Sequence, residues 1–250
     1  MNGFEIFGIV ILSVIGAIFT YAILHLLTLI IMAMLVNPKK EYERSNKFYE
    51  RFFSYTLRII LIVSRVKVVI NGKEKIPKDG RFLLVGNHAS NFDPLIVLAV
   101  FGEYNIRFIS KPENFEIFVL GRLLHRMKFL SMDRDSARNS LKTLLKAVEY
   151  IKNNECSIGV YPEGMRSFSR ELLPFHDGVF KIAIKANVPV VVASMVGQEI
   201  IKNKFPFKKS IVYFDILEVL PVQEKTTSHE LSEQAKTLIQ NKLDEYKDLK

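Results

Sequence analysis

A histidine and an aspartate stand five residues apart in the segment VGNHASNFDPLIV, which covers residues 85–97. An imidazole is largely neutral near pH 7 and can accept a proton, and a carboxylate on its other ring nitrogen would stabilise the imidazolium that forms. His88 and Asp93 could therefore act as a general base and its orienting partner. Asp93 and Pro94 also suit a helix start, as an N-cap residue and a first-turn proline, and one carboxylate can serve both roles.

A second group of polar residues lies in the segment YPEGMRSFSR, residues 161–170, where Pro162, Glu163 and Gly164 interrupt a strand-like run. The interruption is expected to expose Glu163 and Arg166. An arginine can bind a phosphate monoester through two parallel charged hydrogen bonds, so Arg166 is a candidate phosphate ligand. Glu163 would hold Arg166 or meet a substrate hydroxyl; a structural turn with an ion pair is the alternative.

The sequence from residue 66 onward predicts the elements that must position these side chains. Short apolar runs alternate with longer amphipathic ones, which is typical of an α/β fold with a mixed, largely parallel sheet flanked by helices. Ligands of such sheets bind beyond the carboxyl ends of the strands. If the two strands involved are parallel neighbours, His88, Asp93 and Arg166 face one crevice. Strands are expected over residues 66–70, 81–86, 106–110, 129–132, 157–161, 188–196 and 210–220, and helices over 94–102, 114–127, 136–153, 178–186 and 229–247.

The N-terminal segment Phe7–Val36 contains no charged residue and predicts a helix in a membrane. As a straight helix it would be about 45 Å long, more than the roughly 30 Å of a hydrocarbon core, so it must tilt, bend or extend into the interface. Lys39 and Lys40 follow almost directly, and basic residues beside a membrane segment favour the cytoplasmic side. We therefore expect the protein at the cytoplasmic face of the cell membrane.

A second helical stretch, residues 46–65, carries most of its charges in its first half. Five apolar residues can share one face of this helix: Phe52, Phe53, Leu57, Ile60 and Leu61. That pattern suits a helix lying at a membrane interface beside the first one. The prediction is a chain of two parts, in which residues 1–65 form a membrane-docking helical hairpin and residues 66–250 form the α/β domain.

The composition narrows the function classes. Lysine and arginine total 35 and aspartate and glutamate 26, which gives a net charge of +9 and suits nucleic acid, an anionic membrane or a phosphorylated substrate. The sequence has no homeodomain-like helix, zinc-finger spacing or RNA-binding aromatic strand motif, so no nucleic-acid partner is expected. The single cysteine, Cys156, lies in an apolar run and is expected to be buried in a strand. The other histidines, His25, His125, His176 and His229, lack a local carboxylate partner like that of His88.

Four sequence blocks in order resemble the glycerophospholipid acyltransferases, specifically the 1-acylglycerol-3-phosphate acyltransferases. NHASNFD is similar to that family's N-H-x-x-x-x-D block, and KPENFEIFVLGRLLHRMKFLSMDRD to its K-x-E-L…G…D-R block. YPEGMRS is similar to F-P-E-G-T-R-S, and VPVVVASMVG to V-P-I-V-P-V. The chain departs from the pattern at Met165, Asn114 and Ala193, where threonine, leucine and proline are usual.

The resemblance implies transfer of a fatty acyl group from an acyl-CoA or acyl carrier protein thioester to lysophosphatidic acid in the lipid bilayer. It assigns His88 and Asp93 to catalysis and Glu163, Gly164 and Arg166 to the acceptor, with Lys111 and Arg134 extending the positive field. No cofactor and no metal are expected. Glycerol 3-phosphate or another lysolipid is an alternative acceptor.

Two other classes of protein are weighed against this interpretation. A metal-dependent phosphohydrolase would use His88, Asp93 and Glu163 as ligands, although their spacing is unlike that of metalloenzymes. A non-catalytic lipid-binding protein would keep the apolar helices and the basic surface but would have no need of the histidine and aspartate.

Overall fold

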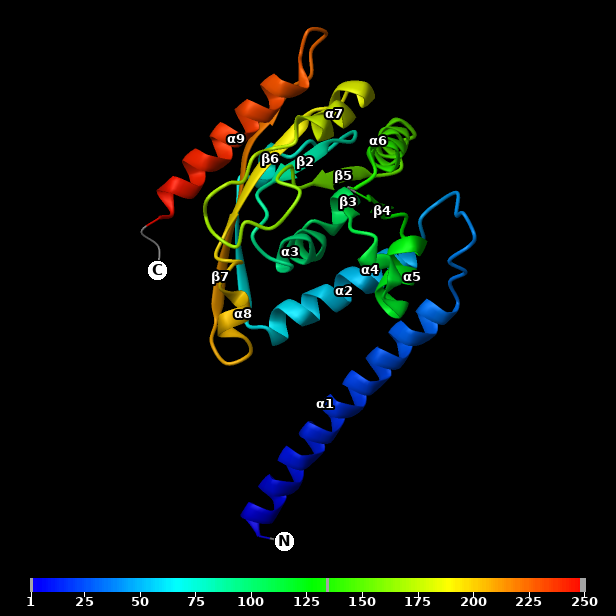
Figure 1. Ribbon diagram of the computed structural model, residues 1–250. Coiled ribbons are helices and arrows are strands. Elements are labelled where there is room, and N and C mark those ends of the chain that lie inside the picture. Colours follow the sequence, from blue (N-terminus) through cyan, green and yellow to red (C-terminus); the bar gives the residue numbers. More distant parts are fainter. Residues whose placement is uncertain (1, 134, 248–250) are drawn as a thin grey trace.

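The computed structural model describes residues 2–133 and 135–247. Within this part of the chain, seven strands form one sheet in the order β1-β7-β6-β2-β5-β3-β4 (Figure 1). Every neighbouring pair is parallel except β6 and β7. The expected mixed, largely parallel sheet is confirmed, with small differences at the strand ends. The strands are β1 Val66–Asn71, β2 Leu83–Gly86, β3 Ile106–Ser110, β4 Leu130–Ser131, β5 Ser157–Val160, β6 Val190–Val196 and β7 Ser210–Leu220.

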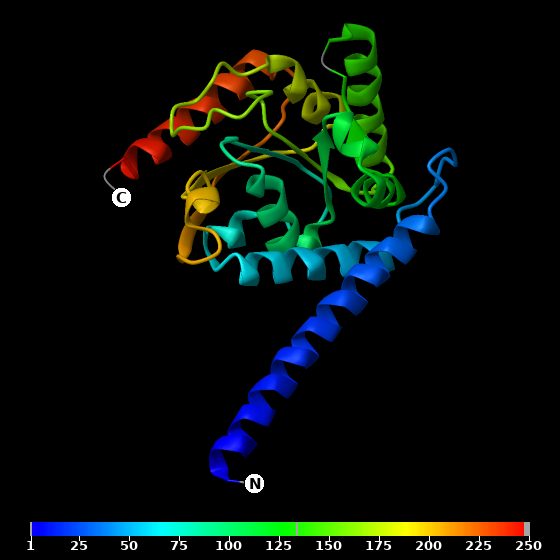
Figure 2. The ribbon, with the colours of Figure 1, turned by 60° about the horizontal axis from the view of Figure 1, so that its bottom comes forward.

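Two layers of helices cover the sheet (Figures 1 and 2). The first layer contains α2 Lys47–Val63, α3 Phe92–Val100 and α5 Phe118–Arg126, and the second contains α6 Ala137–Lys152, α7 Lys181–Ala186 and α9 Ser228–Glu245. Shorter elements complete the list: α4 Glu113–Glu116, α8 Ile201–Lys204 and the 3₁₀ turns Lys73–Lys75, Gly102–Tyr104 and Asp177–Phe180. Helix α8 was not expected from the sequence.

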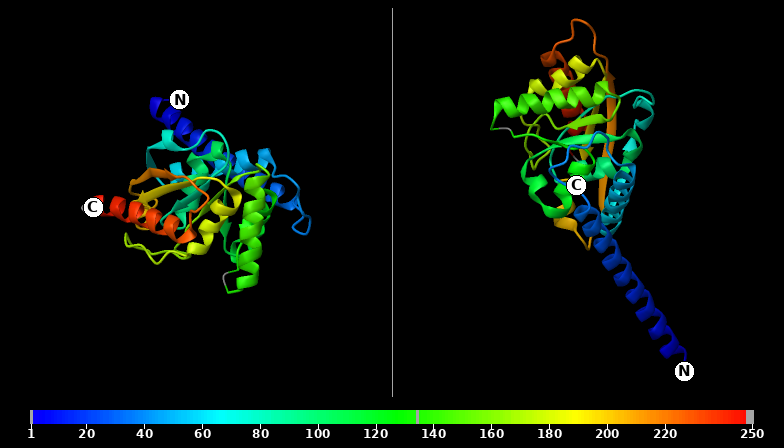
Figure 3. Two further views of the ribbon diagram at one scale, coloured as in Figure 1. Left: turned by 90° about the horizontal axis from the view of Figure 1, so that it is seen from above. Right: turned by 90° about the vertical axis from the view of Figure 1, so that its right-hand side faces the viewer.

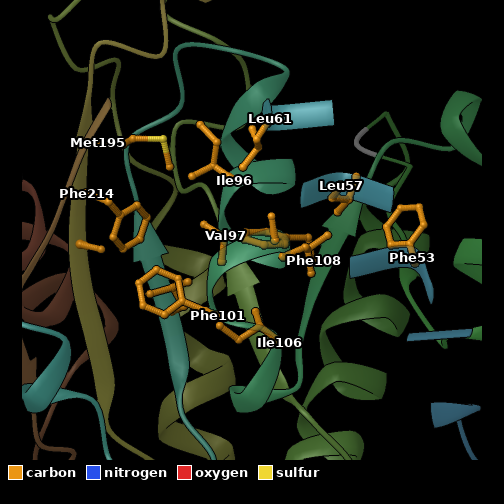
Figure 4. Close-up of a cluster of buried hydrophobic side chains, with 14 of the residues drawn as sticks. Phe53, Leu57, Leu61, Ile96, Val97, Phe101, Ile106, Phe108, Met195 and Phe214 are labelled. Atoms are coloured by element: carbon orange, nitrogen blue, oxygen red, sulfur yellow. The ribbon is translucent and has the colours of Figure 1, made fainter. Parts of the chain in front are cut away.

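The hydrophobic core lies on both faces of the sheet. Successive strand residues point to opposite faces, so Leu84 packs toward the first helical layer while Leu83 and Val85 pack toward the second. Figure 4 shows the first of these clusters, in which side chains from α2 and α3 meet those from β3, β6 and β7. Burial on both faces explains why these strands read as continuous apolar runs in the sequence.

The helix expected over residues 114–127 is two helices. Ile117 adopts an extended conformation, with φ −68° and ψ 117°, and separates α4 from α5. The break brings Phe115 against Gly121, where an added Cβ would lie 2.0 Å from the carbonyl oxygen of Phe115. Only glycine fits this close approach. The apolar periodicity of the sequence runs through the bend without interruption, so it did not predict the bend.

The N-terminal helix α1, Gly3–Met34, is long and apolar enough to cross a membrane, by length and composition. Its most apolar part is not buried against the rest of the protein, and its N-terminal half projects away from the α/β domain (Figures 2 and 3). Its last turn is anchored, because Met32 and Ala33 are buried. The expected apolar helix is therefore present, and it contacts the rest of the protein from Tyr21 to its C-terminal end.

Helix α2 packs against both α1 and the sheet domain. Its buried residues Phe53, Leu57 and Leu61 belong to the first core cluster (Figure 4). Glu50 of α2 forms an ion pair with Arg107 of β3, and the Arg107 side chain is almost fully buried. Helix α2 is therefore part of the α/β core, in addition to its predicted place in the docking hairpin.

Candidate active site

His88 and Asp93 meet just beyond the carboxyl end of β2. Nδ1 of His88 lies 2.8 Å from Oδ2 of Asp93. The same oxygen accepts hydrogen bonds from the backbone N–H groups of Ala89 at 2.8 Å and Ser90 at 2.9 Å. The other oxygen, Oδ1, is buried and accepts no hydrogen bond within the described residues. A single carboxylate oxygen of Asp93 thus closes residues 88–93 into a tight turn.

Asp93 is not the N-cap residue of the helix that follows. Helix α3 begins at Phe92, with Asn91 as its N-cap, so Asp93 lies in the first helical turn. Its side chain accepts from the chain before the helix instead of from the N–H groups inside it. The expectation that one carboxylate would serve as both cap and catalytic partner is therefore wrong in its first part. The hydroxyl of Ser90 accepts from the N–H of Phe92, as expected of a turn residue.

The pair has the electrostatics of an oriented base. Asp93 is fully buried, and burial raises the pKa of its carboxyl, against the opposing effect of the His88 ring and the two backbone N–H groups. With Asp93 as a charged acceptor, Nδ1 of His88 carries the proton and Nε2 keeps its lone pair. The His88 side chain is 18% exposed, so Nε2 can be reached from outside.

Tyr161, at the end of β5, stacks on the histidine. The rings of His88 and Tyr161 lie 4.4 Å apart between centroids and 9° from parallel, and Phe108 of β3 stacks on the other side of Tyr161 at 5.1 Å. Burial raises the pKa of the Tyr161 phenol well above its usual range, so the ring stays neutral. The sequence analysis missed this residue because it ends an apolar run, where an aromatic reads as core.

The loop after β5 holds the backbone of His88 from two sides. Oε1 of Glu163 accepts from the N–H of His88 at 2.6 Å, and Oε2 accepts from the N–H of Leu173 at 3.0 Å. The N–H of Ser167 donates to the carbonyl of His88 at 2.8 Å. These bonds follow from the parallel pairing of β2 with β5, which brings the two sequence blocks to one edge of the sheet.

Glu163 is not exposed, contrary to the expectation from the sequence. It is only 2% exposed, both of its oxygens are occupied by backbone donors, and it forms no ion pair with Arg166 within the described residues. Burial raises the pKa of its carboxyl, while the N–H groups of Leu173 and His88 act against this shift. The chain turns at Pro162, and Glu163 then points inward, where its carboxylate accepts from the backbone N–H groups of His88 and Leu173. Gly164 completes the turn with φ +72°, a backbone conformation that favours glycine.

Two of the basic candidates, Arg166 and Lys111, lie at the same edge of the sheet, because they follow the parallel strands β5 and β3. Arg166 is partly exposed, and its guanidinium lies over the ring of Phe168, 4.8 Å from the centroid. It forms no hydrogen bond or ion pair with another described residue, so its donors are available to a ligand. Lys111 is exposed and directly follows β3. Arg134 lies outside the described residues.

Asn87 joins the site to the neighbouring strand. Its side chain is buried, donates to the carbonyl of Met195 at 2.9 Å and accepts from the Met195 N–H at 2.8 Å. It fixes the end of β2 against β6 immediately before His88. Behind Tyr161, a narrow cavity is lined mainly by apolar side chains, among them Leu84, Val97, Phe108, Ala193 and Phe214.

Other candidate groups are less suited to chemistry. His229 pairs with Asp177 at 2.9 Å, but its side chain is 73% exposed and the pair lies at the start of α9. Cys156 is buried as expected, and burial raises the pKa of its thiol to about 11. Across residues 2–133 and 135–247, no group of three or more His, Cys, Asp and Glu side chains could hold a metal ion.

Comparisons with known proteins agree with the geometry. The family model described as Acyltransferase matches residues 67–196, a little more than half of the chain. A probable 1-acyl-sn-glycerol-3-phosphate acyltransferase of Mycoplasma pneumoniae is 31% identical over 184 residues, which cover 70% of this chain and 68% of that protein. A 1-acyl-sn-glycerol-3-phosphate acyltransferase of Borreliella burgdorferi is 27% identical over 157 residues, which cover 63% of this chain and 60% of that protein.

A solved structure supports the fold. The crystal structure of the 1-acyl-sn-glycerophosphate (LPA) acyltransferase of Thermotoga maritima matches with a TM-score of 0.66 and 24% identity. The match covers 92% of this chain and 89% of that one, so it extends beyond residues 66–250 into the N-terminal segment.

Proposed function

Because this chain belongs to the acyltransferase family, we propose that it transfers a fatty acyl group from a thioester to the free hydroxyl of lysophosphatidic acid, giving phosphatidic acid. The observation that carries the proposal is the bond of 2.8 Å between His88 Nδ1 and Asp93 Oδ2, which leaves Nε2 as an accessible base. The relatives named above as acting on 1-acyl-sn-glycerol 3-phosphate support the choice of acceptor.

The reaction needs one group that acts first as a general base and then as a general acid. Nε2 of His88 takes the proton of the acceptor hydroxyl as its oxygen attacks the thioester carbonyl carbon. Asp93 stabilises the imidazolium that forms. The C–S bond then breaks, the thiolate leaves, and the imidazolium returns the proton to the sulfur. Oxygen takes the acyl group directly, so no covalent intermediate with the protein is required.

The acceptor is held by charge at the mouth of the site. Arg166 binds the phosphate through its two parallel N–H donors, and Lys111 adds positive charge near it; a similar role for Arg134 rests on the resemblance alone. Gly164 shapes the turn that presents Arg166. Glu163 acts as a positioning residue, because its carboxylate holds the backbone of His88 and has no free oxygen for the substrate.

The acyl donor is a water-soluble thioester, either acyl-CoA or acyl carrier protein, and the reaction uses no further cofactor. The acceptor is a lipid, so the site must open to a membrane as well as to water. Helix α1 supplies the attachment, and Lys39 and Lys40 at its end favour the cytoplasmic face of the cell membrane. In this arrangement the lysolipid reaches His88 from the bilayer.

The test is an acceptor panel with the purified full-length protein. Lysophosphatidic acid, lysophosphatidylcholine and glycerol 3-phosphate are each offered with acyl-CoA or acyl carrier protein, and thiol release is measured together with the lipid product. We expect phosphatidic acid from lysophosphatidic acid at the highest kcat/KM. A higher kcat/KM with glycerol 3-phosphate or with lysophosphatidylcholine would contradict the proposed acceptor.

A further inference from the structure

A short basic loop between β6 and β7 presents two phenylalanines to solvent. Phe207 is 83% exposed and Phe205 is 48% exposed. The loop, residues 201–209, also carries four lysines: Lys202, Lys204, Lys208 and Lys209. No aspartate or glutamate occurs between residues 200 and 214, and none of the four lysines forms an ion pair with a described carboxylate. The loop thus combines uncompensated positive charge with exposed aromatic rings.

The loop is held in this arrangement at both ends. Ile201 and Ser210 are fully buried. The N–H of Lys208 donates to the carbonyl of Lys204 at 2.8 Å, and Nη1 of Arg65 donates to the carbonyl of Phe207 at 2.8 Å. The exposure of the phenylalanines is therefore built into a folded loop that is attached to the chain just after α2.

The loop with the exposed aromatic rings lies beside the apolar C-terminal end of α2. Ile62 and Val63, at the C-terminal end of α2, are 74% and 59% exposed. Two residues after Val63, the carbonyl of Arg65 accepts from the N–H of Ser210, so the end of α2 and the loop lie side by side. Exposed apolar side chains that gather in one region, unlike scattered single ones, mark an interaction surface. We call Ile62, Val63, Phe205 and Phe207 the loop patch.

The loop patch lies at the same edge of the sheet as the active site. Strand β6 leads into α8 and the loop, and it runs parallel to β2, with Ala193 paired to Gly86. His88 follows Gly86 by two residues, so both segments leave the sheet at the carboxyl ends of neighbouring strands. Figures 1 and 3 show that α8 and its loop also lie at the end of the domain toward which α1 projects.

From this placement we infer that residues 201–209 are a second membrane contact, which docks on a leaflet containing anionic lipids. Phe205 and Phe207 enter the interfacial region, as aromatic side chains favour, and the lysines extend their amines to the lipid phosphates. The inference rests on the proposed attachment through α1 and adds to it. One helix leaves the domain free to tilt, whereas contacts at α1, at the outer face of α2 and at the loop patch hold the mouth of the site against the leaflet.

A bilayer fits this surface better than an acidic protein does. Lysines on both sides of exposed phenylalanines match a layer of phosphates above an apolar phase, and the loop lies at the end of the domain toward which α1 projects. An acidic protein would account for the lysines but not for exposed aromatic rings at the end of the domain toward which α1 projects.

The chain contains no tryptophan, which permits a direct test in the full-length protein. Phe207→Trp places one fluorophore in the loop, and Gln223→Trp places a control at the exposed turn beyond the far end of β7. Each protein is reconstituted in vesicles of phosphatidylcholine with phosphatidylglycerol, with or without brominated acyl chains. We expect blue-shifted emission at position 207 and quenching by brominated lipid, and neither effect at position 223. Water-like, unquenched emission at 207 would overturn the inference, and this readout does not depend on turnover.

Two double variants measure the consequence for activity. In the full-length chain, Phe205→Ser with Phe207→Ser removes the rings, and Lys208→Gln with Lys209→Gln removes two charges. We expect each double variant to raise the apparent KM for bilayer acceptor about fivefold and to leave the rate on a short-chain, monomeric acceptor within twofold. Equal loss on both acceptors, or a raised KM only for a carrier-protein donor, would contradict a lipid contact. If wild-type protein transfers no acyl group, the proposed function fails while the fluorescence result still stands.

Discussion

At the scale of single residues, three donors converge on one oxygen of Asp93 and thereby fix the ring of His88. The N–H groups of Ala89 and Ser90 hold the carboxylate in the position where it also binds the imidazole. The ring of Tyr161 stacks on one face of the imidazole and thereby fixes the orientation of the imidazole plane. The geometry of the proposed base is therefore set by the turn and the ring stack, and a substrate does not have to create it.

Tyr161 is predicted to act through its ring and not through its hydroxyl. The hydroxyl is buried and has no hydrogen-bond partner within the described residues, so Tyr161→Phe should keep activity and stability close to those of the wild type. Tyr161→Leu removes the stack and should lower kcat roughly 3–10-fold, since such ring pairs contribute about 0.5–1.5 kcal/mol. KM for both substrates should change little. Steady-state kinetics of both variants decide this, and equal loss in Tyr161→Phe would contradict the role of the stack.

Arg166 is predicted to bind the acceptor phosphate through its planar group. Arg166→Lys keeps the charge but loses the paired donors, so KM for lysophosphatidic acid should rise about 10–100-fold, the effect of losing a charged hydrogen bond. KM for the acyl donor serves as the internal control and should stay within twofold. Parallel increases in both KM values would instead indicate that Arg166 supports the loop.

Sequence reasoning predicted that His88 and Asp93 meet, because their types and spacing are unusual at a strand end, and the structure confirms this contact. It wrongly predicted that Glu163 is exposed, because a carboxylate in a turn usually is. The two N–H groups that bind this carboxylate belong to residues 88 and 173, which are distant in the sequence or in another part of the loop. Tyr161 was missed for the opposite reason, since an aromatic residue in a strand usually serves the core. One feature of the sequence could have pointed to Asn87: it is a polar residue directly after a buried apolar run.

At the scale of elements, the strands and the longer helices follow their apolar patterns closely. The bend between α4 and α5 does not, because periodicity carries no information on the approach of Phe115 to Gly121. Helix α8 is too short to give a periodic signal. The parallel pairing of β2 with β5 was stated only as a condition, since strand order depends on contacts between distant segments.

Gly121 gives a test at this scale. Gly121→Ala should lower the free energy of unfolding by about 1–3 kcal/mol, because the added Cβ would force backbone and helix apart. Gly178→Ala is the matched control, because a Cβ there meets nothing within 4 Å. Denaturant unfolding of the two variants is compared with that of the wild type. Equal stability of Gly121→Ala would show that α4 and α5 can separate freely.

At the scale of the whole molecule, α2 joins the apolar helix α1 to the α/β domain. Its inner face buries Phe53, Leu57 and Leu61 in the core, while Tyr55 on its outer face meets Tyr21 of α1 at 2.7 Å between hydroxyl oxygens. The sequence showed the amphipathic pattern of α2 but not that the domain uses its buried face. The functional division of the chain at residue 65 stays a prediction.

A deletion of residues 2–24 tests the attachment without damage to the core. These residues are almost wholly exposed, whereas a deletion through residue 65 would also remove buried side chains and leave Arg107 without Glu50. The shortened protein should stay folded by circular dichroism and bind vesicles more weakly. Its activity should fall on bilayer acceptor and persist on a monomeric one. Full activity on bilayer acceptor would contradict a docking role for α1.

The most direct test of the account is acyl transfer by His88→Ala. With His229→Ala as the control, since that histidine also pairs with an aspartate but on the surface, both purified proteins are assayed for thiol release and phosphatidic acid formation. We predict that His88→Ala keeps its fold and loses about 10²–10⁴-fold in kcat, the usual cost of removing a general base, while His229→Ala keeps wild-type turnover. A folded His88→Ala protein with near-normal turnover would contradict the mechanism.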